Sequence, residues 1–337
     1  MAGIPGTQLD EGTTALIRDY NLGGVILFAR NIENPIQIAV LCSDLQRTAL
    51  RHHGLPLFIS VDQEGGRVSR LRNPFTEFPG NAAIGLDKYP LYMAEKFGRI
   101  TALEMELVGL NMDLAPVVDV RAGEPERHLK GRIFGDNPEA VALLGRRVIR
   151  SLQESGIMAV AKHFPGLGRA SIDPHFNLPK IEIAIKEMEK INLVPFKAAI
   201  DEGVSAVMTS HAIYPDLDPQ LPATLSLEIL TRLLREKLGF NGLIITDDME
   251  MGAIAKHRGV AEGTAVSFEA GADILLICKN KDNVIKSFEI IRDKLLQGRI
   301  PFQRLHQSYK RIQMAKSKFL SRENKISITK IKEYFKL

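Results

Sequence analysis

The sequence predicts one α/β domain folded as a (β/α)8 barrel of the TIM type. Three observations indicate this fold. Short apolar runs alternate with longer segments of helical periodicity, each run is apolar throughout, and polar residues follow nearly every run. Continuously apolar strands are typical of a parallel sheet that is buried on both faces. An open doubly wound sheet is the competing arrangement.

Seven apolar, β-branched runs are the predicted strands. They are residues 23–29, 57–61, 112–118, 157–161, 206–210, 242–246 and 273–278. A closed barrel needs one more strand, and "MAGIP" at residues 1–5 is the candidate. We expect this first strand to be short or truncated, and a misassigned start at Met1 would account for its length.

The segments between the runs carry apolar residues at i, i+3, i+4 and i+7, as amphipathic helices do. They are residues 35–50, 90–109, 137–155, 184–203 and 225–239. No change in composition divides the chain. We therefore expect a catalytic barrel over residues 1–300, followed by a helical extension over residues 301–337 that packs on the barrel and ends in a basic tail.

Polar residues follow the predicted strands at points far apart in the sequence. They are Arg30, Asn31, Asp62, Asp119, Lys162, His163, His211, Asp247, Asp248, Lys279 and Asn280. In a barrel the carboxyl ends of all strands meet on one face, where active sites lie. Some of these residues could only cap helices, but the recurrence favours a barrel with a polar pocket over an open sheet.

The composition excludes several classes of protein. The net charge of +4 comes mostly from the C-terminal segment, which is typical of a solvated helix rather than a nucleic-acid-binding surface. No apolar run approaches the roughly 20 residues that span a bilayer, and no signal peptide is evident. Cys42 and Cys278 lie in apolar surroundings and are expected to be buried free thiols. We expect a cytoplasmic monomer with no nucleic-acid or membrane partner.

Two strand ends carry carboxylates that could perform chemistry. Asp62 precedes Gly65 and Gly66 in "SVDQEGGRVSRL", and it could accept two adjacent hydroxyls from a ligand. Asp247 and Asp248 end the run "GLIIT". Neighbouring side chains of a strand point to opposite faces, so one carboxylate should serve the pocket while the other orients groups or caps a helix. A buried carboxylate beside a sugar can attack the anomeric carbon.

The stretch "KHFPGLGRASIDPH" at residues 162–175 contains two histidines and an aspartate but no glutamate. Alternation predicts that Lys162 and His163 point to different faces. Asp173 could fix the tautomer of His175 and raise its basicity, which would give an acid/base group. Taken alone, this motif is more typical of a polar surface loop.

A metal site is the alternative use of these side chains. Its candidate ligands are His163, His175, His211 and Asp247. The chain has neither an H-x-H at its first strand nor an H-E-x-x-H. We therefore expect no metal and no cofactor.

Together, these segments resemble glycoside hydrolase family 3, and specifically its β-N-acetylglucosaminidase (β-N-acetylhexosaminidase) branch. The matching segments are "GGVILFARNI" (23–32), "SVDQEGGRVSRL" (60–71), "NMDLAPVVDV" (111–120), "GRIFGDNP" (131–138), "KHFPGLGRASIDPHFNLP" (162–179), "VMTSHAIYPDLD" (207–218), "PATLS" (222–226), "GFNGLIITDDMEM" (239–251) and "AGADILLICKN" (270–280). The most specific part is K-H-F-P-G-x-G followed by D-x-H, in register with D-Q-E-G-G and the T-D-D strand end.

The resemblance implies a TIM-type barrel and a retaining glycosidase. It implies that Asp247 is the nucleophile and that His175 is the acid/base, assisted by Asp173. It implies sugar-binding roles for Asp62, Arg70, Arg132, Lys162 and His163. It further implies removal of terminal β-linked N-acetylglucosamine from muropeptides during peptidoglycan recycling. A histidine replaces the usual carboxylic acid in this branch, which accounts for the absent glutamate.

The chain departs from the commonest family pattern in the loop that carries the D-x-H. Leu167 stands where many members have His, Arg169 and Ala170 where they have Asp-Thr, and Pro174 where they have Ser. These changes concern loop flexibility and contacts with the leaving group, and Arg169 could meet an acidic group there. The alternative functions are a β-N-acetylglucosaminide phosphorylase, a metal-dependent barrel hydrolase and a non-catalytic sugar-binding protein.

Overall fold

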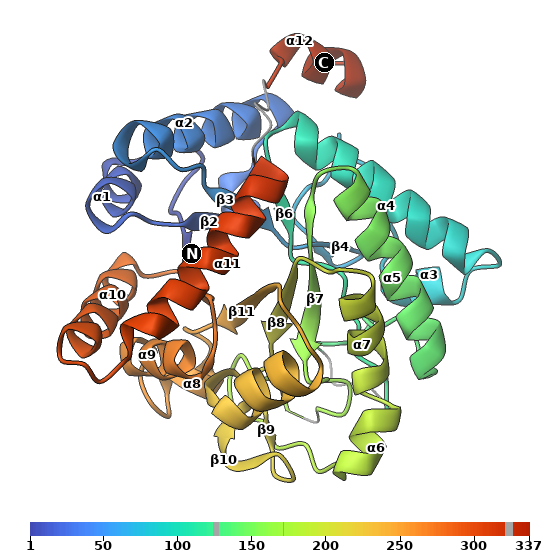
Figure 1. Cartoon of the computed structure of the whole chain (residues 1–337). Coiled ribbons are helices and arrows are strands. Elements are labelled where there is room, and N and C mark those ends of the chain that lie inside the picture. Colours follow the sequence, from blue (N-terminus) through green and yellow to red (C-terminus); the bar gives the residue numbers. More distant parts are fainter. Residues whose placement is uncertain (124–127, 171, 321–325) are drawn as a thin grey trace.

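The protein is a parallel β-barrel surrounded by helices, as the sequence predicts (Figure 1). The computed structural model describes residues 1–123, 128–170, 172–320 and 326–337. The barrel strands, in spatial order, are β1 (Ala2–Gly3), β2 (Gly24–Leu27), β3 (Phe58–Val61), β6 (Met112–Asp113), β7 (Met158–Phe164), β8 (Ala206–Thr209), β11 (Leu243–Asp248) and β12 (Ile274–Leu276). Each of the seven predicted runs overlaps one of these strands, and β7 and β11 extend past the ends of their runs.

The short first strand is what closes the barrel. Ala2 pairs with Val25 of β2 on one side and forms a parallel bridge to Ile277 on the other. The backbone amide of Gly3 donates to the carbonyl of Ile277 at 2.9 Å. A Cβ at Gly3 would lie 2.0 Å from the carbonyl oxygen of Cys278, so only glycine allows this approach. The predicted first strand therefore exists, although it is only two residues long.

Helices link the strands and form the outer layer. They are α1 (Glu11–Tyr20), α2 (Pro35–His53), α3 (Asn81–Gly85), α4 (Pro90–Leu107), α5 (Pro138–Glu154), α6 (Ile185–Lys190), α7 (Leu193–Asp201), α8 (Gly252–Ala255), α9 (Val260–Ala270) and α10 (Lys281–Leu296), with a π-helix over Glu228–Lys237. Local sequence sets where α5 begins. Its N-cap Asn137 accepts a hydrogen bond from the amide of Ala140, and Pro138 occupies the first helical position.

The segment predicted as one helix over residues 184–203 forms two helices instead, α6 and α7. Pro195 lies in the first turn of α7, where its missing N–H costs no hydrogen bond. The same proline could not sit inside one continuous helix without breaking the hydrogen-bond ladder. Asn192, between the helices, donates from its side chain to the carbonyl of Gly166 at 3.2 Å.

Two hairpins leave the barrel at its carboxyl end. β4 (Gln63–Gly65) pairs with β5 (Val68–Ser69), and β9 (Ile213–Tyr214) pairs with β10 (Asp218–Pro222). The first hairpin follows β3 directly, and it therefore carries the residues after Asp62 over the barrel mouth.

The two C-terminal helices lie at different places, one on the barrel strands and the other on the outer helical layer. α11 (Phe302–Leu320) crosses one end of it (Figure 1), and its residues Ile312, Ala315 and Phe319 pack against the apolar cluster inside the strands. α12 (Ile328–Phe335) contacts α2, and the ring of Phe335 lies 4.8 Å from that of Phe75. Over the residues that the structure describes, no helix is both long and apolar enough to cross a membrane.

Lys316 of α11 is a buried cation, and replacing it should stabilise the fold. Its side chain lies 5.2 Å from the Phe58 ring, and burial lowers the pKa of its amine from 10.5 to about 8. A shift of this size corresponds to a cost of about 3 kcal/mol near neutral pH. We expect Lys316→Met to raise the free energy of unfolding at pH 7 by a comparable amount, measured by urea denaturation.

The pH dependence of that gain has a defined sign. Between pH 8 and 10.5 the unfolded chain holds the lysine proton and the folded chain does not, so the wild type gains stability as the pH rises. The advantage of Lys316→Met should therefore shrink over this range. Lys318→Met, at an exposed position of the same helix, is the control and should change little. A pH-independent difference would contradict this explanation.

Candidate active site

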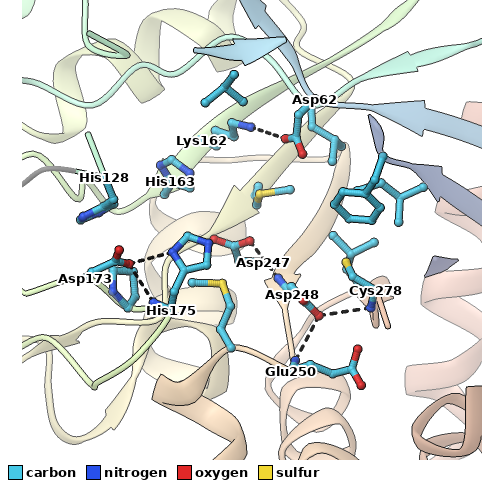
Figure 2. Close-up of a pocket in the computed structure, with 18 of the residues that line it drawn as sticks. Asp62, His128, Lys162, His163, Asp173, His175, Asp247, Asp248, Glu250 and Cys278 are labelled. Atoms are coloured by element: carbon cyan, nitrogen blue, oxygen red, sulfur yellow. Dashed lines mark hydrogen bonds and ion pairs between the residues drawn. The ribbon is translucent and has the colours of Figure 1, made fainter. Parts of the chain in front are cut away.

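A cavity of about 560 Å³ opens at the carboxyl ends of the strands. All eight site residues expected from the sequence line it, although they come from distant segments. They are Asp62, Arg70, Arg132, Lys162, His163, Asp173, His175 and Asp247. Figure 2 shows several of them directed toward the same space. A cavity of this volume is in the range of small-molecule binding sites.

Glu64 joins two cations at the base of the cavity. Its carboxylate accepts two hydrogen bonds from the guanidinium of Arg132, at 2.7 and 2.8 Å, and a third contact from the amine of Lys162 at 2.6 Å. Burial alone would raise the pKa of Glu64, but the two cations lower it well below its usual range. Glu64 is 1% exposed, so this ion cluster is shielded from water.

Asp62 extends the cluster toward the cavity. One carboxylate oxygen accepts from the amine of Lys162 at 2.8 Å, and the other from Arg70 at 3.3 Å. Burial alone would lower the pKa of Lys162, but the attraction of Asp62 and Glu64 outweighs it and raises that pKa. Lys162 is therefore positively charged at neutral pH, and both it and Arg70 line the cavity.

His163 is oriented by Asp119, which follows the isolated parallel bridge between Val117 and Lys162. Its Nδ1 lies 2.8 Å from Asp119 Oδ2, and the other oxygen of Asp119 accepts from the amide of Leu167 at 2.6 Å. Its Nε2 lies 3.4 Å from a guanidinium nitrogen of Arg132, which can only donate. This network assigns the proton to Nδ1 and makes Nε2 the acceptor.

Lys162 and His163 both line the cavity, which differs from the prediction of opposite faces. β7 continues through both residues to Phe164, and the register of its pairing with β8 shifts between Ala161 and Phe164. Simple alternation does not hold in such an irregular strand end.

Asp247 and Asp248 end β11 and have different surroundings. Asp247 accepts a hydrogen bond from the Asp248 amide at 2.8 Å. Burial would raise its pKa, but nearby His211, His163 and Lys162 together with that hydrogen bond lower it. Asp248 accepts from the amides of Cys278 at 3.2 Å and Glu250 at 3.1 Å, and burial raises its pKa to about 6.

Asp173 and His175 form a hydrogen-bonded pair at the cavity edge. Asp173 Oδ1 lies 2.7 Å from His175 Nδ1 and accepts from the His175 amide at 2.9 Å. Partial burial would raise the pKa of Asp173, but these two bonds lower it. The imidazole of His175 points from Asp173 toward Asp247 (Figure 2). Its side chain is 57% exposed, which leaves it access to solvent.

The positions that depart from the family pattern are divided between the cavity and the surface. Leu167 and Pro174 line the cavity. Arg169 forms an ion pair with Glu187 of α6 and is not among the cavity-lining residues. The contact between Arg169 and an acidic leaving group is therefore not prepared in this conformation. Ser171, in the same stretch, lies outside the described residues.

Glu64 and Asp119 are the residues whose roles sequence reasoning missed. Asp62 and Glu64 are two apart at a strand end, a spacing that puts both carboxylates on one side of an extended chain. This spacing is the feature of the sequence that could have indicated a role for Glu64 beside Asp62. In the described part of the chain, no group of three or more His, Cys, Asp or Glu could hold a metal ion.

Comparison with known proteins identifies the family. The model of the glycosyl hydrolase family 3 N-terminal domain matches residues 3–315. The chain belongs to glycosyl hydrolase family 3. As a member of this family it is a glycosidase, which confirms the class of enzyme predicted from the sequence.

Relatives of this family 3 enzyme include a beta-hexosaminidase of Thiobacillus denitrificans, 35% identical over 84% of this chain and 78% of the relative. A β-N-acetylglucosaminidase structure from Paenibacillus has a TM-score of 0.93 at 37% identity, over 95% of this chain. The chain spans 61% of the length of that structure's chain. NagZ from Neisseria gonorrhoeae has a TM-score of 0.84 at 31% identity, over 100% of this chain and 93% of NagZ.

Removing Glu64 should destabilise this family 3 enzyme and weaken catalysis together. Glu64→Ala leaves the buried charges of Lys162 and Arg132 without their shared partner, and breaking a buried ion pair costs about 3–5 kcal/mol. We expect a loss of this size in urea denaturation and a reduced kcat/KM. Glu77→Ala breaks an exposed pair with Arg72, and this control should cost less than about 1 kcal/mol. Equal effects of both substitutions would contradict the role given to Glu64.

Proposed function

We propose that this protein is a retaining β-N-acetylhexosaminidase that releases terminal, non-reducing β-linked N-acetylglucosamine. The observation that carries the proposal is that an ionised buried carboxylate, Asp247, and a hydrogen-bonded Asp173–His175 pair line the same cavity. The names of the relatives support the sugar: curated relatives are beta-hexosaminidases, and a structural neighbour is a β-N-acetylglucosaminidase.

In the first step, Asp247 attacks the anomeric carbon while the bond to the leaving oxygen breaks. Protonated His175 gives its Nε2 proton to that oxygen, so the leaving group departs as a neutral alcohol. Asp173 faces Nδ1 and stabilises the imidazolium before the transfer. The lowered pKa of Asp247 keeps the nucleophile ionised at neutral pH, as this attack requires.

In the second step, water attacks the ester between the sugar and Asp247. Neutral His175 takes a proton from that water, and the carboxylate of Asp247 is regenerated. Two inversions at the same carbon retain the β configuration. The exposed position of His175 suits both tasks, since it must meet the leaving group and then a solvent molecule.

The sugar itself would be held by the ion cluster. Lys162 and Arg132 can donate to its hydroxyls, and Asp62 can accept from two adjacent hydroxyls. Because Glu64 already fixes the two cations, little side-chain entropy is lost on binding. Arg70 and Nε2 of His163 border the same space.

We further propose that the natural substrates are peptidoglycan-derived muropeptides. Resemblance to the family branch supports this assignment, and product analysis on a GlcNAc–anhydro-muramyl substrate tests it. Release of free N-acetylglucosamine is the expected result. If phosphate accelerates turnover and GlcNAc-1-phosphate appears instead, the enzyme is a phosphorylase.

Asp247→Ala should abolish turnover because the variant lacks the attacking carboxylate. Loss of a nucleophile typically costs several orders of magnitude in kcat. Hydrolysis of an aryl β-N-acetylglucosaminide measures the rate, and calorimetric titration with N-acetylglucosamine should show binding retained. Near wild-type hydrolysis by this variant would exclude Asp247 as the nucleophile.

His175→Ala should lose activity in proportion to how much the leaving group needs a proton. We expect a fall of about 10²–10⁴ in kcat/KM for a phenyl glycoside, and a much smaller fall for a dinitrophenyl glycoside. A series of aryl glycosides of graded leaving-group pKa measures this dependence. Equal losses across the series would argue against His175 as the acid.

A further inference from the structure

The loop that carries Asp173 and His175, which we call the catalytic loop, is hydrogen-bonded to the segment that follows Asp247. Three successive carbonyls of the loop accept hydrogen bonds from residues 252–256. The amide of Ala253 donates to Pro174 at 3.2 Å, the amide of Gly252 donates to His175 at 3.0 Å, and the amine of Lys256 donates to Phe176 at 2.8 Å. We call these three bonds the latch.

Gly252 allows this close approach because it has no side chain. A Cβ there would lie 2.6 Å from the carbonyl oxygen of Phe176 and 2.8 Å from that of His175. Both neighbours are backbone atoms, which cannot move aside as a flexible side chain can. Any larger residue at position 252 must therefore push the loop away.

The latch is directly continuous with the strand that carries Asp247. A tight turn joins them, in which Met251 donates to the Asp248 carbonyl at 3.0 Å and the Glu250 amide donates to the Asp248 carboxylate at 3.1 Å. The path from Asp247 to Gly252 is thus short and held at two points. A shift of the latch would change the position of His175 relative to Asp247.

The root of the loop is held by other contacts. The amide of Leu167 is bound by Asp119, and Arg169 pairs with Glu187. These contacts do not touch residues 174–176. The latch therefore holds the far end of the loop independently of the contacts at its root.

We propose that Gly252 and Lys256 are positioning residues that hold the acid/base His175 in register with the nucleophile Asp247. This inference rests on the proposed function. The latch adds nothing to sugar binding at the ion cluster, and its contribution is to the proton transfers that His175 performs.

The experiment compares Gly252→Ala with the wild type on phenyl and dinitrophenyl β-N-acetylglucosaminides. Misplacing a catalytic group by about 1 Å can cost 10²-fold. We expect kcat/KM for the phenyl glycoside to fall about 10–100-fold, while the value for the dinitrophenyl glycoside stays within about 3-fold. Deglycosylation also needs His175 as a base, so kcat on the dinitrophenyl glycoside should fall and added azide should restore it.

Gly98→Ala is the matched control for crowding a buried glycine. Its Cβ would lie 2.7 Å from Ser151 in the interface between α4 and α5, outside the latch. Any loss of activity in this variant should be the same for both substrates. Equal losses on both substrates in Gly252→Ala would overturn the proposal.

Lys256 provides a second test that does not crowd the fold. Lys256→Met removes one exposed hydrogen bond, so a loss of about 2–5-fold on the phenyl glycoside is expected. Lys256→Arg retains a donor and should recover most of it. Hydrogen exchange at the amides of Phe176 and Asn177 should quicken in Gly252→Ala and not in Gly98→Ala. Unchanged exchange together with no difference between Met and Arg at position 256 would also overturn the latch.

His175→Ala in the same series separates the two proposals. If His175→Ala shows no dependence on the leaving group, the acid/base assignment fails. If it does show that dependence and Gly252→Ala does not, the assignment stands and the latch is wrong.

Discussion

The site depends on one buried carboxylate. Glu64 pairs with two cations, Lys162 at the end of β7 and Arg132 far along the chain. Together with Asp62, which also binds Lys162, it compensates charges that would otherwise be costly to bury. Their positions then determine the others, since Lys162 binds Asp62 and Arg132 approaches Nε2 of His163. A ligand therefore meets charges that are already paired and oriented, with little reorganisation left to perform.

The charges around the cavity give two adjacent carboxylates different pKa values. Asp247 lies near His211, His163 and Lys162, and its pKa is lowered. Asp248 lies beside Asp247 and Glu250, and burial with this repulsion raises its pKa to about 6. Neighbouring residues of one strand thus serve different purposes: one presents a charge to the cavity, and the other holds the chain after β12 through the Cys278 amide.

Sequence reasoning succeeded where the signal was local or periodic. The apolar runs located the strands, and the polar strand ends pointed to Asp62, Lys162, His163 and Asp247, which line the cavity. Arg70, Arg132, Asp173 and His175 line it too, but only the resemblance to the family singled them out. The role of Glu64 escaped because its partner Arg132 is 68 positions away, and a single sequence does not show which loops meet. The course of β7 through Lys162 and His163 escaped because register shifts leave no trace in composition. Pro195 indicated the break between α6 and α7, but the apolar periodicity continues across the break and predicted a single helix.

The closure of the barrel constrains when the chain can fold. β1 binds the segment after β12, so the ring of strands joins the N-terminus to residues far along the chain. The amine of Met1 donates to the carbonyl of Leu275, 274 positions on. Loop closure over such a distance is slow. During synthesis, the strands already made form an incomplete barrel, and its edge stays unpaired until β12 leaves the ribosome. α11 comes later still, so the apolar interior at its end of the barrel remains uncovered until almost the whole chain is made.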